Sequence, residues 1–165
     1  MYSGTIGNRI FFGPSLDSPA NMLKRKKNAV CAPEVTDMFF DVSCQPYFSF
    51  KDSAKAFKKI CEIYGGIDIL ISNAGTAIGG SIAEVEDAVL RKSFEENFFS
   101  HQNCASEAIK IMKKQNINGC LLFNISKQSV NPGKNFGPYG LPKSALLSLC
   151  KQYAIDYGSF GIRSN

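Results

Sequence analysis

Residues 67–75, IDILISNAG, give the strongest fold signal in this chain of 165 residues. An almost unbroken apolar run leads into Ser72, Asn73 and a glycine, without the polar alternation of a strand that has one wet face. A run of this kind is typical of a parallel strand that is covered on both faces. We therefore expect a buried strand here, followed by a turn.

Upstream of this stretch, the pattern predicts a strand and a helix. Residues 37–43, DMFFDVS, are a short apolar run that ends near Asp41, as in a buried strand. Residues 48–66 have helical spacing of apolar side chains and end in two glycines, as helices often do. The side chains on the apolar face are Phe50, Ala54, Phe57, Ile60 and Cys61.

Downstream, the alternation of helix and strand continues. We expect a long helix over residues 83–115, a strand at residues 119–126 (GCLLFNIS), a helix over residues 139–157 and the start of a strand at residues 161–165. Pro142 would lie in the first turn of the helix that starts at Tyr139, where proline is tolerated.

This alternation predicts an α/β fold with a parallel sheet and helices on both faces, a three-layer αβα sandwich. Residues 1–35 contain several breakers of helix and strand, so we expect this segment to be irregular and residues 36–165 to form the domain. In such sheets, ligands bind at the carboxyl ends of the strands. Asn73 and Ser126 both follow predicted strand ends, so the polar side chains should converge at that edge.

Composition excludes several classes of protein. With 44% hydrophobic and 20% charged residues the chain is typical of a globular protein, and no apolar run is long enough to cross a membrane. The N-terminus has no signal-peptide pattern, so we expect a cytoplasmic protein. The six cysteines have no CxxC spacing, and His101 is the only histidine. A metal site built from several histidines is thereby excluded, and no metal is expected.

The net charge is +5, and the densest basic run is KRKK at residues 24–27. Runs of this kind occur in proteins that bind nucleic acid or anionic membranes. This run has no interleaved aromatic residues and is not repeated elsewhere in the chain. We therefore favour a solvated surface patch, and expect neither nucleic acid nor a membrane as a partner.

Tyr139 and Lys143 have the clearest chemistry. At positions i and i+4 they share one face of the predicted helix. A nearby ammonium stabilises phenolate and lowers the pKa of a tyrosine from about 10, so that the phenol can act as a general acid–base near neutral pH. A serine such as Ser126 can hold a carbonyl or alkoxide oxygen beside it. The spacing alone is weak, because Tyr47 and Lys51 repeat it without a strand end before them.

Four segments occur in the order and at the intervals of a known family. They are DILISNAG (68–75), SFEENFF (93–99), LLFNIS (121–126) and YGLPKSALL (139–147). Together they resemble the short-chain dehydrogenase/reductase family over about residues 39–165, which is most of the chain. The resemblance implies a Rossmann-like domain, NAD or NADP as cofactor, and an oxidoreductase that interconverts an alcohol and a carbonyl by hydride transfer.

The resemblance also assigns a role to each matching residue. Tyr139 would donate and accept the proton, Lys143 would activate it and bind the nicotinamide ribose, and Ser126 would orient the substrate. Asn97 would hold a water of the proton relay. The cofactor-binding residues would be Asp41 and Val42 at the adenine ring, Asn73, Ala74 and Gly75 beside the cofactor pocket, and Tyr139 and Lys143 at the ribose.

Plain structural interpretations of the same residues stay open. Ser126 could simply end a strand, Asn97 could be a helix-surface residue, Asn73 could belong only to a turn, and Asp41 could be a surface cap. The sequence also departs from the family pattern, because no strand leads into a TGxxxGxG turn and the chain stops at GIRSN. We therefore expect a truncated domain that lacks the first strand, the glycine-rich loop and the C-terminal strands.

Residues 123–165 resemble a subgroup, the dehydrogenase part of bifunctional rhamnulose-phosphate aldolase/short-chain dehydrogenases. That likeness implies a small-molecule substrate, such as the hydroxy-aldehyde lactaldehyde. Members of the family are often oligomers, which implies a homo-oligomer through the Asn97 and Tyr139 helices. Two other hypotheses remain: a catalytically inactive remnant or interaction module, and a basic nucleic-acid-binding protein.

Overall fold

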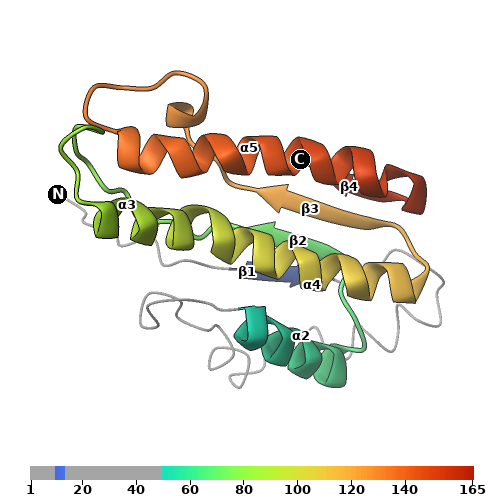
Figure 1. The fold of residues 1–165 in the computed structure, drawn as a ribbon. Helices are drawn as coiled ribbons and strands as arrows, with labels where there is room; N and C mark the ends of the chain where they lie inside the picture. Colours follow the sequence, from blue (N-terminus) through green and yellow to red (C-terminus); the bar gives the residue numbers. More distant parts are fainter. Residues whose placement is uncertain (1–9, 14–49) are drawn as a thin grey trace, which may run out of the picture.

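The computed structural model describes residues 10–13 and 50–165, which have an α/β arrangement (Figure 1). The elements in chain order are β1 (Ile10–Gly13), α2 (Phe50–Tyr64), β2 (Ile69–Ser72), α3 (Asp87–Phe94), the π-helical turn η2 (Glu95–Phe99), α4 (Ser100–Gln115), β3 (Gly119–Phe123), the 3₁₀ turn η3 (Lys127–Ser129), α5 (Gly137–Tyr157), the 3₁₀ turn η4 (Gly158–Phe160) and β4 (Ile162–Ser164). Asp41, Val42 and the strand expected at residues 37–43 lie outside the described residues.

The strands form one sheet in the order β1-β2-β3-β4. β2, β3 and β4 are parallel neighbours, with Ser72 paired to Phe123 and Leu121 paired to Ser164. Helices connect each of these strands to the next (Figure 1), as parallel pairing requires. The predicted α/β fold with a parallel sheet is therefore confirmed, including a strand at the C-terminal end of the chain.

β1 corrects the expectation that residues 1–35 are irregular. Residues Ile10–Gly13 form a strand that pairs antiparallel with β2, from Ile10 opposite Ser72 to Gly13 opposite Ile69. The outer edge of β2 would otherwise present a row of unpaired N–H and C=O groups, and the short IFFG segment satisfies them. A four-residue strand is too short to show a clear hydrophobic period, which is why the sequence did not indicate it.

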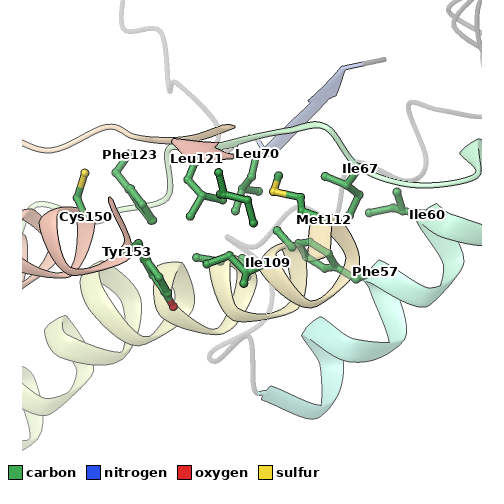
Figure 2. Close-up of a cluster of buried hydrophobic side chains, with 14 of the residues drawn as sticks. Phe57, Ile60, Ile67, Leu70, Ile109, Met112, Leu121, Phe123, Cys150 and Tyr153 are labelled. Carbon is green, nitrogen blue, oxygen red and sulfur yellow. The ribbon is translucent and has the colours of Figure 1, made fainter. Parts of the chain in front are cut away.

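The hydrophobic core lies between the sheet and the helices α2, α4 and α5 (Figure 2). Leu70 of β2 and Leu121 of β3 are fully buried, and they belong to the same cluster as Phe57, Met112 and Leu146 from the three helices. Leu122 points to the opposite face of β3 and is 36% exposed. Within residues 50–165 the helices thus cover one face of the sheet, whereas the apolar runs led us to expect helices on both.

The long helix expected over residues 83–115 begins later and is interrupted. Residues 82–84 form a turn, α3 begins at Asp87, and the π-helical turn η2 separates α3 from α4. Asn116 ends α4 in the left-handed conformation, with φ of 51°, which asparagine tolerates. The interruption places Asn97 at the point where the helix widens.

α5 begins at Gly137, two residues before the expected start. Pro138 occupies its N-terminal turn, where a missing N–H has no helical partner to lose. Pro142 consequently lies inside the helix rather than in its first turn. The carbonyl of Pro138 therefore lacks the i+4 N–H that an ordinary helix would provide.

Other features of the described ranges bear on the functional class. No helix among residues 10–13 and 50–165 is long and apolar enough to cross a membrane. The same residues contain no cluster of His, Cys, Asp and Glu side chains that could hold a metal ion. Cys61, Cys104, Cys120 and Cys150 are free thiols.

We predict that Leu121→Ala lowers the free energy of unfolding by about 2–5 kcal/mol, because it opens a cavity in the centre of the core. Leu122→Ala, on the next residue of the same strand, is the matched control and should lower it by about 1 kcal/mol or less, since its side chain is partly exposed. Urea unfolding followed by circular dichroism measures both. Equal losses would show that the core does not lie on the Leu121 face.

Candidate active site

The candidate site lies where β2 and β3 end and α5 begins. The register of the two parallel strands places Asn73 and Asn124 side by side directly after them. The Asn124 amide donates a hydrogen bond to Asn73 Oδ1, and the Asn124 backbone N–H donates to Ser72 O at 2.9 Å. Gly80 N–H donates to Asn135 O at 2.7 Å, which ties the loop after β2 to the loop before α5. Polar groups from both loops thus meet at the carboxyl edge of the sheet, as this class of fold leads us to expect.

Lys143 extends from α5 into this edge and is almost completely buried, with 2% of its surface exposed. Its Nζ donates to Ala74 O at 2.9 Å and to Asn124 O at 3.4 Å, and lies 3.3 Å from His101 Nε2. Burial lowers the pKa of Lys143 from 10.5 to about 8. The ammonium is therefore held by backbone carbonyls and titrates closer to neutral pH than that of an exposed lysine.

Gly75 leaves the space that two of the predicted site residues occupy. A Cβ atom at residue 75 would lie 2.8 Å from Asn97 Oδ1 and 3.1 Å from Lys143 Nζ. Any side chain there would have to displace the Asn97 amide, which is itself held by hydrogen bonds. The glycine of the Asn-Ala-Gly turn is thus explained by the close approach of Asn97 and Lys143 to the backbone.

Asn97 is fully buried in the π-helical turn η2. Its Oδ1 accepts from the Thr76 backbone N–H at 3.1 Å, and its Nδ2 donates to Thr76 O at 3.0 Å. The same Nδ2 donates to the backbone oxygen and to the Oγ of Ser93, each at 3.0 Å. Both polar atoms of the amide are engaged by the protein, so the side chain fixes the loop after β2 to the helix.

His101 lies one helical turn after Asn97 and is fully buried. Its Nε2 is 2.8 Å from Ala74 O, and its Nδ1 is 2.6 Å from Ser72 Oγ. A carbonyl oxygen can only accept, so Nε2 carries the proton and Nδ1 accepts from the Ser72 hydroxyl. His101 and Lys143 therefore donate to the same carbonyl.

The imidazole of His101 stays neutral at physiological pH. Burial is the main reason why its pKa falls from 6.5 to about 3, the positive charge of Lys143 lowers it further, and the hydrogen bond to Ala74 acts in the opposite direction. A neutral ring donates to Ala74 O without placing a second positive charge beside the ammonium of Lys143.

Ser126 and Tyr139 lie on the more open side of the site. The Oγ of Ser126 caps η3 by accepting from Gln128 N–H at 3.2 Å, which uses a lone pair and leaves its proton available. Tyr139 is partly exposed in the first turn of α5, and within residues 50–165 its hydroxyl has no hydrogen-bond partner. Ser144 Oγ bonds to Ser129 O at 3.0 Å and to Gly140 O at 2.9 Å, which ties the Ser126 turn to α5.

The structure therefore gathers the predicted residues in two groups. Ala74, Gly75, Asn97 and Lys143 are in direct contact, whereas Ser126 and Tyr139 are joined to them through η3 and α5. In the part of the chain that the structure describes, no hydrogen bond links the side chains of Ser126, Tyr139 and Lys143 to one another. Asp41 and Val42, the predicted adenine contacts, lie outside the described residues.

The donors at Lys143 fit the ribose end of a nicotinamide cofactor. An ammonium has three protons, and two of them point to Ala74 O and Asn124 O. The third has no acceptor in His101, because Nε2 already carries a proton. That donor, together with the uncommitted Tyr139 hydroxyl, suits the hydroxyl groups of a ribose. No glycine-rich turn between a strand and a helix N-terminus, which would hold the cofactor phosphates, occurs within residues 50–165.

Sequence reasoning missed the parts played by His101 and Asn124. His101 was used only to exclude other sites, although its place four residues after Asn97 put it on the same helix face. Asn124 follows β3 as Asn73 follows β2, so an alignment of the two strand ends would have indicated it. The contact of Ser72 with His101 could not have been predicted from the sequence, because nothing but its burial in the folded protein distinguishes this serine.

A parallel sheet whose carboxyl edge holds a Tyr-x-x-x-Lys helix defines a Rossmann-like domain. The chain belongs to the short-chain dehydrogenase family, whose sequence profile matches residues 13–165. This match begins before residue 36, where the sequence analysis placed the start of the domain.

Two relatives illustrate the match. An uncharacterized oxidoreductase of Bacillus subtilis, YuxG, is 36% identical over 115 residues, which is 70% of this chain and 17% of that protein. Human dehydrogenase/reductase SDR family member 4 is 31% identical over 116 residues, or 70% of this chain and 41% of that protein. The chain thus spans less than half the length of the curated relatives that it matches.

Solved structures share the same fold. Aldohexose dehydrogenase from Thermoplasma acidophilum has a TM-score of 0.67 at 26% identity and covers 71% of this chain and 45% of that chain. A gluconate 5-dehydrogenase from Burkholderia cenocepacia, in complex with NADP and tartrate, has a TM-score of 0.68 at 24% identity. The match covers 71% of this chain and 46% of that chain. At the latter identity the likeness shows the fold alone.

We predict that Lys143→Met raises the free energy of unfolding at pH 7 by about 1–2 kcal/mol. The pKa of Lys143 in the folded protein, about 8, is below the unfolded value of 10.5, so a buried charge destabilises the fold at every pH below about 8. This penalty disappears as the pH rises toward 10.5. Loss of the hydrogen bonds to Ala74 and Asn124 reduces the gain.

Urea unfolding at pH 7 and at pH 10 measures this effect. The gain should shrink at the higher pH, and Lys151→Met, on the exposed face of the same helix, should show no such pH dependence. A Lys143→Met variant that is less stable than the natural protein at both pH values would contradict the prediction.

We predict that His101 remains the neutral Nε2–H tautomer down to about pH 4. Between its folded pKa of about 3 and the unfolded value of 6.5 only the unfolded chain binds the extra proton, so stability should fall as the pH is lowered. The loss should be about 1.4 kcal/mol per pH unit. Because His101 is the only histidine, long-range proton–nitrogen NMR assigns its ring directly. Titration near pH 6.5 in the folded protein would disprove this.

Proposed function

We propose that this chain provides the catalytic edge of an NAD(P)-dependent oxidoreductase that interconverts an alcohol and a carbonyl. The observation that supports the proposal most strongly is the buried ammonium of Lys143, four residues from Tyr139 on α5. A lysine that donates only to backbone carbonyls and lacks a carboxylate partner in the described ranges adds no stability that a neutral side chain could not supply. A catalytic or cofactor-binding role would explain why a charged side chain is buried at this edge of the sheet.

Tyr139 is the proposed acid–base. In alcohol oxidation the phenolate takes the hydroxyl proton as the carbon–hydrogen bond breaks, and in carbonyl reduction the phenol returns a proton to the oxygen. The family likeness gives Lys143 the role of stabilising the phenolate by its positive charge. Ser126 donates to the substrate oxygen, since the bond from Gln128 N–H uses a lone pair of its Oγ and leaves the hydroxyl proton available.

A nicotinamide cofactor, when bound, supplies or accepts the hydride. Lys143 and Tyr139 would hold its ribose hydroxyls, and the Asn73-Ala74-Gly75 turn would line its pocket. Asp41 and Val42 remain the proposed adenine contacts. The Asn97 amide is engaged at both ends, so a relay water would bind to the backbone of Asn97 rather than to its side chain.

The substrate we propose is a small hydroxy-aldehyde or polyol. A structural neighbour at 26% identity is named an aldohexose dehydrogenase, and an aldohexose carries several hydroxyl groups and an aldehyde carbon. The subgroup likeness to rhamnulose-phosphate aldolase/short-chain dehydrogenases favours lactaldehyde. YuxG, of which the match covers only 17%, is a much longer protein, which is compatible with a dehydrogenase part in a larger chain.

Self-association through the Asn97 and Tyr139 helices is part of the proposal. Leu141 and Ile155 are exposed apolar side chains on α5, at 46% and 76%. Single exposed apolar residues are common on monomers, so these two support an interface only together with the family likeness.

The alternative is a non-catalytic interaction module with the same fold. It is favoured by the lack of a glycine-rich phosphate turn within residues 50–165. Nucleic-acid binding through residues 24–27 is the weaker alternative, because that basic run has no interleaved aromatic residues and is not repeated elsewhere in the chain. It predicts salt-dependent binding, which a null result at low salt would exclude.

We predict that Tyr139→Phe lowers kcat for carbonyl-dependent NADH or NADPH oxidation by at least about 100-fold, because it removes the proton donor. Lys143→Ala should act in the same direction. The matched controls are Tyr157→Phe and Lys151→Ala on the same helix, which should keep the activity of the natural protein.

Absorbance at 340 nm with lactaldehyde or glycolaldehyde measures this turnover. Activity that survives Tyr139→Phe would exclude the assigned site. A natural protein without turnover on any hydroxy-aldehyde, and without cofactor binding, would favour the interaction module.

A further inference from the structure

Pro142 removes a hydrogen bond from the interior of α5. In an α-helix the N–H of residue 142 would bond to the carbonyl of residue 138, but proline has no N–H and its ring crowds that carbonyl. Pro138 and Pro142 are both fully buried, so the carbonyl lies in a region of low solvent access. A buried carbonyl without a partner is strongly unfavourable, and another donor is therefore needed.

Ser93 of α3 supplies that donor. Its Oγ donates to Pro138 O at 2.7 Å, and the residue is fully buried. A helical serine commonly donates to the carbonyl four residues earlier in its own helix, as Ser100 does to Glu96 O at 2.7 Å. Ser93 instead donates across the interface between α3 and α5.

Asn97 fixes the direction of this bond. Its Nδ2 donates to Ser93 Oγ at 3.0 Å, so the serine hydroxyl accepts from the amide and directs its single proton to Pro138. Asn97 in turn is held by both backbone polar groups of Thr76. A continuous hydrogen-bonded path thus runs from the loop after β2 to the first turns of α5.

Each proline directly precedes a proposed catalytic residue, since Tyr139 follows Pro138 and Lys143 follows Pro142. We propose, on the basis of the function proposed above, that Ser93 is a positioning residue. It replaces the helical hydrogen bond that Pro142 removes, and so sets the orientation of the turn that presents Tyr139 and Lys143. Neither the sequence pattern nor the resemblance to the family assigned a role to Ser93.

A double-mutant cycle tests the replacement. Pro142→Ala restores an N–H that can bond to Pro138 O within α5. Ser93→Ala should raise the unfolding equilibrium constant roughly tenfold in the natural background, but only about twofold in the Pro142→Ala background. Equal effects in the two backgrounds would overturn the proposal. Ser100→Ala is the control, because its bond stays within its own helix and its effect should not depend on residue 142.

Hydrogen exchange locates the effect. In Ser93→Ala, exchange at the amides of residues 139–144 should accelerate more than exchange in the second half of α5, and protection should return in the double variant. Uniform acceleration along α5, or acceleration that Pro142→Ala does not reverse, would reduce Ser93 to a general packing role and would overturn the proposal.

Turnover gives the functional readout. Ser93→Ala should lower kcat about tenfold with little change in KM, and the double variant should recover it, because the substrate pocket is intact and only the turn is displaced. A loss of kcat that the double variant does not recover contradicts the positioning role. If the natural protein has no turnover, the proposed function fails, while the unfolding and exchange experiments still decide the role of Ser93.

Discussion

The carbonyl oxygen of Ala74 is the acceptor on which this site depends. Lys143 of α5 donates to it from Nζ at 2.9 Å, and His101 of α4 donates to it from Nε2 at 2.8 Å. Gly75, the next residue, leaves the space for both Lys143 and Asn97. The turn after β2 is therefore fixed to two helices by buried polar contacts rather than by apolar packing, and such contacts have strict directions. A displacement of this turn would leave a lysine, a histidine or an asparagine unsatisfied in the interior.

The apolar core permits this arrangement. Leu70, Leu121 and Leu146 are fully buried in β2, β3 and α5, the same elements that lead into the site. Their burial stabilises the fold and offsets the destabilising effect of the buried polar groups. Lys143 is destabilising as an ion in this environment, and His101 is confined to its neutral form. The sheet thus has a stabilising apolar centre and a polar carboxyl edge whose geometry is maintained at some expense of stability, as expected of a functional site.

The sequence was informative where the signal is local. The apolar runs at residues 67–75 and 119–126 located β2 and β3, and the spacing of Tyr139 and Lys143 located the helix face that enters the site. It was not informative where a role depends on a partner far away in the chain. Lys143 and Ala74 are 69 residues apart, and no periodicity indicates that they meet. The π-helical turn, the engaged Asn97 amide and the tautomer of His101 all follow from such contacts.

Local irregularities in this chain nevertheless identify where those contacts lie. Gly75 leaves the space that Asn97 and Lys143 occupy, and Pro142 breaks the hydrogen bonding of α5 where Ser93 donates in place of its N–H. In both cases a glycine or proline lies against a buried polar side chain from another element. Where a proline interrupts a helix next to a proposed catalytic lysine, the element that packs against this helix is therefore expected to supply a hydrogen-bond donor. The donor that satisfies the freed carbonyl also determines how the catalytic turn is held.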